Sequence, residues 1–149
     1  MDFLEWVAAT DDMVAEKAYH IDHYSHLIAR SAKWSYKYAV RLGERFLEGE
    51  DAILTSPEWT YQYTYAVIQD RWPAGEGTIL KSAMWTYEYI YYVMHCEPWP
   101  EAEPILLTSA IYAAEYAIHV MYTRWLAAES IIGTDLLATK RYREFINTL

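Results

Sequence analysis

The feature that most constrains the fold is a repeat of about 26 residues that runs through the middle of the chain. Each copy has a serine, an aromatic residue three positions later and a tyrosine four positions after that. A second block follows, with an aromatic residue and then a glutamate four positions on. The copies begin at Ser31, Ser56, Ser82 and Ser109. Because two separate blocks keep one period through four copies, the sequence indicates a tandem array.

The second copy shows why each unit is expected to begin with a helix. Ser56 is a residue type favoured at helix N-caps, and Pro57 fits the first helical position. From there Trp59, Tyr63 and Val67 fall at i, i+4 and i+8, which places them on one face of an α-helix. The pattern therefore predicts a helix that buries an aromatic stripe.

The same copy also predicts a turn and a second helix. The long helix is expected to end near Gln69. The residue before a proline avoids helical angles, so Trp72 marks a turn and Pro73 begins a shorter helix. Each copy is then a helix of about three turns, a tight turn, and a helix of about two turns. A departure occurs in the first copy, where Gly43 falls inside the predicted long helix.

Two-helix units of this size cannot bury their own apolar faces, so stacking is required. We predict an all-α fold: an α-solenoid of about four helix-turn-helix repeats with end-capping helices. The whole chain, 1–149, is expected to form one domain. Residues 31–132 hold the four repeats, 1–30 an N-terminal cap or degenerate repeat, and 133–149 a C-terminal capping helix, which begins like a fifth copy at Thr134-Asp135.

The N-terminal segment is harder to align with the repeat. Thr10-Asp11 is expected to cap the helix of a degenerate first copy. Phe3, Leu4 and Trp6 precede it, and they are expected to cover the exposed end of the stack. If that end stayed apolar, it would offer a surface for a homodimer.

The second copy also carries a family resemblance. Ser56-Pro57-Glu58-Trp59 followed by Arg71-Trp72-Pro73 resembles a tandem repeat of hypothetical proteins from tailed bacteriophages. The similarity spans about Ser31 to Ile132, and it describes the repeat rather than an activity. It implies an accessory phage protein that acts in the cytoplasm of the infected cell and disarms a host defence protein.

The charge and cysteine content narrow the function classes. The net charge of −9 argues against direct nucleic-acid binding, which needs lysine and arginine on the phosphates. It permits binding to a basic protein surface or imitation of a polyanion. A single cysteine, Cys96, excludes an internal disulfide and favours a cytoplasmic location. No apolar run reaches the length of a membrane span, so no membrane partner is expected.

A set of tyrosines recurs on a second helix face. They are either fillers of the groove between neighbouring hairpins or an exposed recognition ladder, because tyrosine is enriched at interfaces. The set is Tyr36, Tyr61, Tyr65, Tyr87 and Tyr91.

One glutamate recurs in each copy, and two interpretations are open. Each glutamate either accepts a hydrogen bond from a tyrosine hydroxyl or pairs with a nearby arginine, or the four form a row of carboxylates that mimics nucleic acid. The set is Glu50, Glu76, Glu103 and Glu129.

No constellation points to catalysis or to a cofactor. His20, His23 and His26 are spaced so that all three cannot face one metal ion on a helix, so no metal site is predicted. We therefore predict a non-enzymatic protein-binding module that binds a host bacterial protein through one face of the stack. The alternatives are a protein that sequesters a nucleotide or small ligand between aromatic rings, and an acidic nucleic-acid mimic.

Overall fold

The computed structural model describes residues 2–149, except for the side chain of Asp22. The described residues form helices and turns without a strand, which confirms the all-α prediction. The chain divides into two compact units, unit 1 (Met1–Ile79) and unit 2 (Leu80–Leu149). Each unit contains two of the repeats, so a continuous stack of four stays a prediction.

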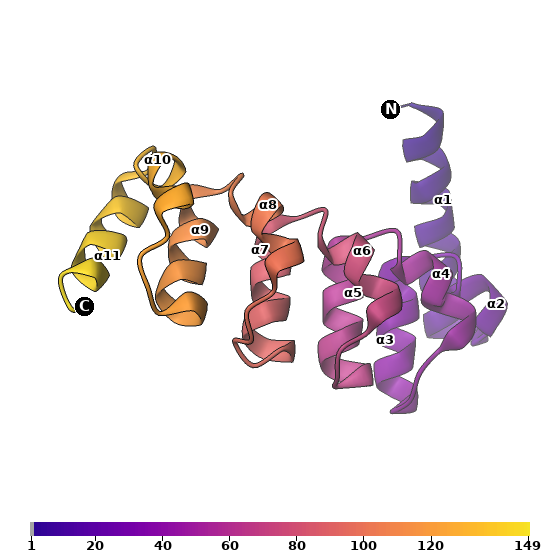
Figure 1. The fold of residues 1–149 in the computed structure, drawn as a ribbon. Coiled ribbons are helices and arrows are strands. Elements are labelled where there is room, and N and C mark those ends of the chain that lie inside the picture. Colours follow the sequence, from indigo (N-terminus) through magenta and orange to yellow (C-terminus); the bar gives the residue numbers. More distant parts are fainter. Residues whose placement is uncertain (1) are drawn as a thin grey trace. The chain divides into compact units, whose positions relative to one another are not determined.

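Unit 1 consists of long helices that alternate with short ones (Figure 1). Its elements are α1 (Phe3–Lys17) with a π-helical turn (Ala18–Asp22), α2 (Ser25–Ile28), α3 (Ala32–Leu42), a 3₁₀ turn (Leu47–Gly49) that leads into α4 (Glu50–Ile53), α5 (Pro57–Tyr63) with a π-helical turn (Thr64–Ile68), and α6 (Pro73–Ile79).

Unit 2 repeats this alternation and ends in a single long helix. Its elements are α7 (Ala83–Glu88) with a π-helical turn (Tyr89–Val93), a 3₁₀ turn (Pro100–Ala102) that leads into α8 (Glu103–Leu106), α9 (Ala110–Tyr116) with a π-helical turn (Ala117–Met121), a 3₁₀ turn (Leu126–Ala128) that leads into α10 (Glu129–Ile132), and α11 (Leu136–Ile146). Below, the first to fourth repeats are the pairs α3–α4, α5–α6, α7–α8 and α9–α10.

The predicted serine caps start all four long repeat helices. In each, the serine hydroxyl accepts a hydrogen bond from the backbone N–H three residues later, which satisfies one of the free donors of the first turn. The serines are Ser31, Ser56, Ser82 and Ser109. Asp135 caps helix α11 in the same way, accepting from Ala138 at 2.8 Å.

The helix ends follow a rule that the sequence pattern did not reveal. The second, third and fourth repeats end their long helices with a π-helical turn. In all four repeats a residue at the equivalent position has a left-handed backbone. These residues are Gly43, Gln69, His95 and Tyr122, with φ between 52° and 73°. The prediction that Gly43 lies inside its helix is wrong, because it is the residue that caps α3 after Leu42.

The helix start predicted at Thr10-Asp11 is also wrong. Helix α1 runs without a break from Phe3 to Lys17, and it starts at a capping box between Asp2 and Glu5. Thr10 lies inside this helix, where its hydroxyl donates to the Trp6 carbonyl at 2.9 Å. Phe3 remains 74% exposed, so this segment does not cover the end of the stack.

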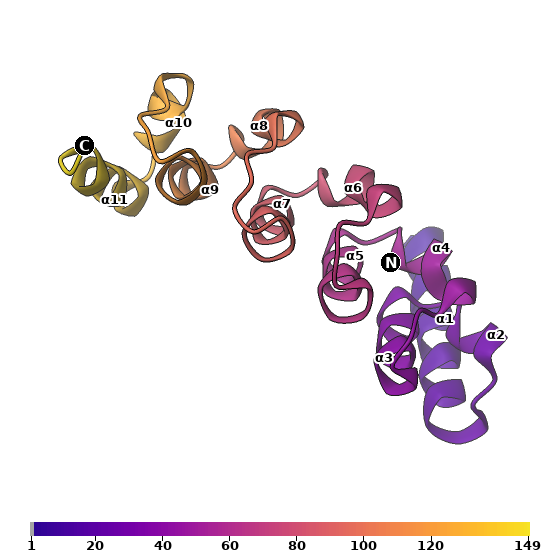
Figure 2. The same ribbon diagram turned by 60° about the horizontal axis from the view of Figure 1, so that its bottom comes forward.

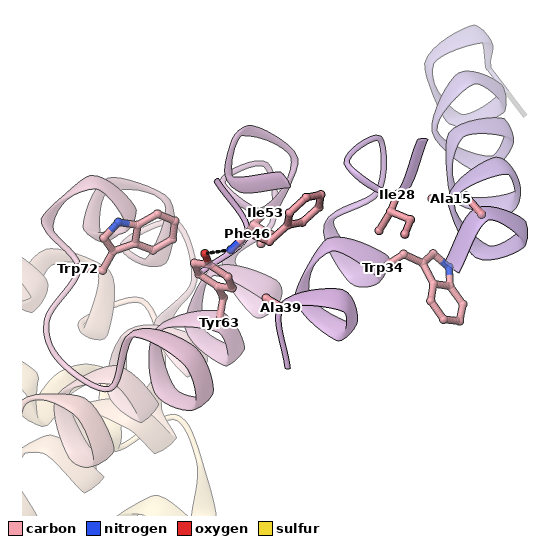
Figure 3. Packing of buried hydrophobic residues seen from close by; sticks show 9 residues of the cluster. Ala15, Ile28, Trp34, Ala39, Phe46, Ile53, Tyr63 and Trp72 are labelled. Carbon is pink, nitrogen blue, oxygen red and sulfur yellow. Dashed lines mark hydrogen bonds between the residues drawn. The ribbon is translucent and has the colours of Figure 1, made fainter. Parts of the chain in front are cut away.

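The core of unit 1 lies between α1, α3 and α5 and the short helices that pack beside them. Figure 2 shows α4 and α6 on the same side of the long helices α3 and α5, and α8 and α10 placed likewise in unit 2. Figure 3 shows residues of the unit 1 core, including Trp34, Phe46, Ile53 and Tyr63. Because both repeats of unit 1 contribute aromatic and aliphatic residues to this core, helices that are only a few turns long bury enough apolar area to stay folded.

Candidate functional site

A tyrosine of one repeat is hydrogen-bonded to the preceding repeat at a recurring junction. In unit 1 the Tyr63 hydroxyl accepts from the buried Phe46 N–H at 3.0 Å and donates to Glu50 at 2.7 Å (Figure 3). Arg45 donates two further hydrogen bonds to the same carboxylate, at 2.8 Å each. Burial, and then the hydrogen bond to Glu50, raise the pKa of Tyr63 to about 12.

The junction recurs in unit 2. The Tyr116 hydroxyl accepts from the Trp99 N–H at 3.0 Å, and the Tyr142 hydroxyl accepts from the Trp125 N–H at 2.8 Å. Tyr142 also donates to Glu129 at 3.2 Å. These contacts satisfy buried backbone donors at the turn between the two helices of a repeat, where no intrahelical partner exists.

The recurring glutamates therefore follow the structural interpretation. Glu50 and Glu129 each bind an arginine and a tyrosine hydroxyl, and Glu76 pairs with Arg71 at 2.8 Å. The ion pair with Arg124 holds the pKa of Glu129 below its usual range. In the third repeat a proline, Pro98, replaces the arginine that would pair with Glu103. Burial raises the pKa of Tyr116, and the negative charge of Glu103 raises it further. Since three of the four glutamates hold internal partners, they do not form a free row of phosphate-like charges.

Sequence reasoning missed Tyr142 as a junction residue. The basic run around it suggested that the last helix had lost the aromatic pattern. Tyr142 lies one period, 26 residues, after Tyr116, and this spacing is the signal that would have identified it.

The second-face tyrosines separate into two groups. Tyr36 packs against Trp59 of the next repeat with ring centroids 5.5 Å apart, and Tyr87 packs against Tyr112 at 5.7 Å. Tyr61 is also buried. Tyr36 and Tyr87 therefore fill grooves between neighbouring hairpins.

Tyr65 and Tyr91 make up the second group. They are 51% and 38% exposed, and each stacks near the tyrosine one turn before it. An exposed ladder of all five tyrosines does not exist in the structure, and Tyr65 and Tyr91 are the exposed members of the set.

The exposed part of this set in unit 2 lines a small surface groove, which we call the tyrosine–carboxylate groove. Helix α7 and the π-helical turn after it form one wall, and α9 with its own π-helical turn forms the other. Its lining residues are Tyr87, Glu88, Tyr91, Tyr92, Glu115 and His119.

Aromatic edges and faces define this groove. The ring centroid of Tyr91 lies 4.8 Å from that of Tyr92, 5.9 Å from that of Tyr87 and 6.2 Å from that of His119. Tyr87 forms the buried floor, whereas Tyr91 and Tyr92 are exposed. Burial, reinforced by the nearby Glu115 carboxylate, raises the pKa of Tyr87 far above its ordinary value, so it stays a neutral phenol.

The two carboxylates of the groove have different surroundings. Glu115 forms an ion pair with Arg141 of α11 and lies 3.2 Å from His119 Nε2. Glu88 has no hydrogen bond or ion pair to any residue that the structure describes, and partial burial raises its pKa. A carboxylate that is partly desolvated and unpaired beside aromatic rings favours a cation, because both the charge and the ring faces attract it.

Sequence reasoning had identified Tyr87 and Tyr91 but not the other groove residues. Glu88 and Tyr92 lie three and seven positions after Trp85, and Glu115 and His119 stand in the same relation to Tyr112. In each pair the two residues are four positions apart and therefore lie on one helix face. The repeat alignment could thus have identified them as groove residues.

The three histidines considered for a metal site each contact a different residue. His20 packs against Trp34, His23 lies near Arg41, and His26 lies near Tyr24. Within residues 2–149, no group of three side chains of the metal-binding types is placed to hold an ion.

Comparison with protein-family models, curated proteins and solved structures gives no match. The fold defines the class as an all-helical protein. No helix in the described part of the chain is both long enough and apolar enough to cross a membrane.

Proposed function

We propose that the chain is a non-enzymatic protein-binding module whose tyrosine–carboxylate groove takes a basic side chain of a partner protein. The observation that carries the proposal is Glu88, an unpaired and partly desolvated carboxylate beside Tyr91 and Tyr92. Arg141 already occupies the neighbouring carboxylate, Glu115, which shows the kind of group that this surface accepts.

The groove suits an arginine better than a lysine. A guanidinium is planar and weakly hydrated, so it stacks on aromatic rings while it donates two hydrogen bonds to a carboxylate. Tyr91 and Tyr92 add contact area at little cost in conformational entropy, as tyrosine does at many interfaces. An arginine on a partner surface would therefore be held by charge and stacking together.

The resemblance to phage repeat proteins supplies the biological setting of this proposal. We propose that the chain is an accessory phage protein that acts in the cytoplasm of the host cell. Its partner would be a basic surface of a host defence protein, and binding would inhibit that protein by covering the surface.

The experiment is a fluorescence-anisotropy titration of the full chain with labelled peptides of equal length. One peptide carries arginines, the second lysines at the same positions, and the third glutamines. We expect saturable binding in the order arginine, lysine, glutamine, with affinity that falls as salt is added because exposed charges are screened.

The variant that tests the site is Glu88→Gln, which keeps the side-chain shape and removes the charge. Loss of a charged hydrogen bond is expected to weaken arginine-peptide binding by about tenfold or more. The matched control is Glu101→Gln, an exposed glutamate of the same unit outside the groove. Equal binding of all three peptides, or equal loss in both variants, would contradict the proposal.

A further inference from the structure

A second surface, in unit 1, has the opposite chemistry. Helix α3 carries Lys33, Lys37 and Arg41 at successive intervals of four residues, so the three lie along one helix face. No residue in the described part of the chain forms an ion pair with any of them. We call these three residues the basic stripe, and it stands out in a chain with a net charge of −9.

The stripe lies on aromatic rings instead of carboxylates. Lys33 Nζ and Lys37 Nζ lie 5.0 and 4.6 Å from the ring centroid of Trp34. The Arg41 guanidinium carbon lies 3.6 Å from the ring centroid of Tyr19, and its Nη1 donates to the Tyr19 carbonyl at 3.0 Å. These contacts orient the cations and leave their charge unneutralised.

The two carboxylates that share a depression with the stripe already have partners. Lys33 borders a depression that Asp11 and Asp12 also line. Asp11 pairs with Arg30, and Asp12 accepts a hydrogen bond from the Ser31 hydroxyl at 2.5 Å. Lys37 and Arg41 line a different pocket, which contains no acidic residue.

That pocket offers a flat apolar wall beside the two cations. Its lining residues are Tyr19, Tyr36, Lys37, Val40 and Arg41. Tyr36 is held in place from behind by Trp59, and Val40 is 49% exposed. The Trp34 indole N–H, beneath the lysines, is buried without a hydrogen-bond partner. The pocket in this part of unit 1 therefore offers positive charge and aromatic surface, and no carboxylate lines it.

From this geometry we infer that the pocket binds a nucleotide, with its phosphates on Lys37 and Arg41 and its base against Tyr36 and Val40. The two cations are one helical turn apart, about 6 Å along the axis, so their long side chains can converge on neighbouring phosphates. Lys33, one turn further, extends the site toward a terminal phosphate. A base stacks on tyrosine whatever its identity, because every base has a π-face.

The inference concerns a different unit from the proposed function and does not depend on it. Glu88 lies in unit 2 and the pocket in unit 1. Glu88→Gln should therefore leave nucleotide affinity unchanged, and Lys37→Gln should leave arginine-peptide affinity unchanged, so the two ideas fail separately.

The test is isothermal titration calorimetry of the full chain with ATP, with tripolyphosphate and with adenosine, at one ionic strength. We expect ATP to bind more tightly than either part alone, since phosphate and base contribute together. No saturable heat with ATP would overturn the inference. Tripolyphosphate binding as tight as that of ATP would also overturn it, because the site would then recognise charge alone.

The variants locate the site. Lys37→Gln removes one cation that has no hydrogen bond to lose, and it should weaken ATP binding by about tenfold or more. Tyr36→Leu should lower the preference for ATP over tripolyphosphate. The control is Arg143→Gln, an exposed cation in α11. Thermal unfolding without ligand confirms that each variant is folded, and a Lys37→Gln variant that is folded but binds ATP as the parent does would refute the site.

Discussion

The first repeat, in unit 1, and the fourth repeat, in unit 2, share one framework and carry different charges on the same helix face. Lys37 and Arg41 of α3 occupy the repeat positions that Glu115 occupies in α9 and His119 in the π-helical turn after it. Both helices start at a capping serine and end at a left-handed residue. The framework positions are buried and hydrogen-bonded, so they tolerate little change, whereas the exposed face can change its chemistry from repeat to repeat.

The two candidate ligand surfaces also differ in the sign of their unpaired charge. Unit 1 presents unpaired cations beside Tyr36, and unit 2 presents an unpaired carboxylate beside Tyr91. The same scaffold therefore presents unpaired positive charge in one unit and unpaired negative charge in the other.

The largest effect is expected at the junction tyrosines. Tyr63→Phe and Tyr142→Phe each remove the hydroxyl that accepts from a buried backbone N–H. An unsatisfied buried donor costs about 1–3 kcal/mol, and both variants should lose stability in this range in urea denaturation. Tyr24→Phe, at an exposed ring, is the control and should change stability by less than about 0.5 kcal/mol. A shared junction is refuted if only one of the two variants is destabilised beyond the control.

A second test concerns the close approach between the two helices of a repeat. A Cβ at Gly49 would lie 2.5 Å from Ser35 Cβ and 2.6 Å from the Phe46 ring, whereas unit 2 has Ala102 and Ala128 at this repeat position. Gly49→Ala should therefore destabilise the protein by about 1–2 kcal/mol, since overpacking outweighs the gain in helix propensity.

Gly77→Ala is the matched control for this test. A Cβ at Gly77 meets nothing within 4 Å, and the residue lies inside α6. Alanine should stabilise the helix there by about 0.5–1 kcal/mol. Thermal unfolding of both variants measures the difference in sign, and a stabilised Gly49→Ala would show that unit 1 can adopt the spacing of unit 2.

The left-handed helix ends give a third test, with effects of opposite sign. Gly43→Ala places a Cβ at a φ of 73° and should cost about 1 kcal/mol. Tyr122→Gly relieves the same strain at the equivalent position, where the ring is 66% exposed, and should gain up to about 1 kcal/mol. Chemical denaturation measures both, and a loss of stability in Tyr122→Gly would mean that its ring contributes more than its backbone costs.

The smallest effect is expected from Glu88 and depends on pH. Partial burial raises the pKa of this carboxyl in the folded state above its unfolded value. The folded state therefore holds the proton more firmly, and this residue lowers the stability as the pH rises from the unfolded pKa through the folded one. Glu88→Gln should unfold at a slightly higher temperature than the parent at pH 7 and at the same temperature near pH 3. A difference of equal size at both pH values would exclude titration as its cause.

Much of the local structure could be predicted from the sequence. The capping serines, the turn before Pro73 and the pairing of Arg45 with Glu50 all follow from local chemistry, because the interacting residues lie within a few positions of each other. The junction bond between Tyr63 and Phe46 spans 17 residues and was not predicted; the sequence indicated only a hydrogen bond from a tyrosine hydroxyl to the recurring glutamate.

The binding surfaces were less predictable. Tyr36 and Tyr91 both belong to the predicted second-face set, yet one fills a groove and the other is exposed. Their burial depends on what the next repeat places opposite them, and a periodic pattern does not specify that neighbour. The uninterrupted α1 was missed because Thr10 resembles a cap whether or not the chain turns there.

The amino-acid sequence by itself determined the helical class, the period of the repeat and the residues that begin each long helix, because these depend on contacts within one or two turns. Tertiary structure decided which charges are neutralised: Glu50 and Glu115 meet arginines, whereas Glu88 and Lys37 meet no opposite charge in the described chain. Charge pairing depends on distances of a few ångströms between side chains of packed helices, and only packing sets those distances.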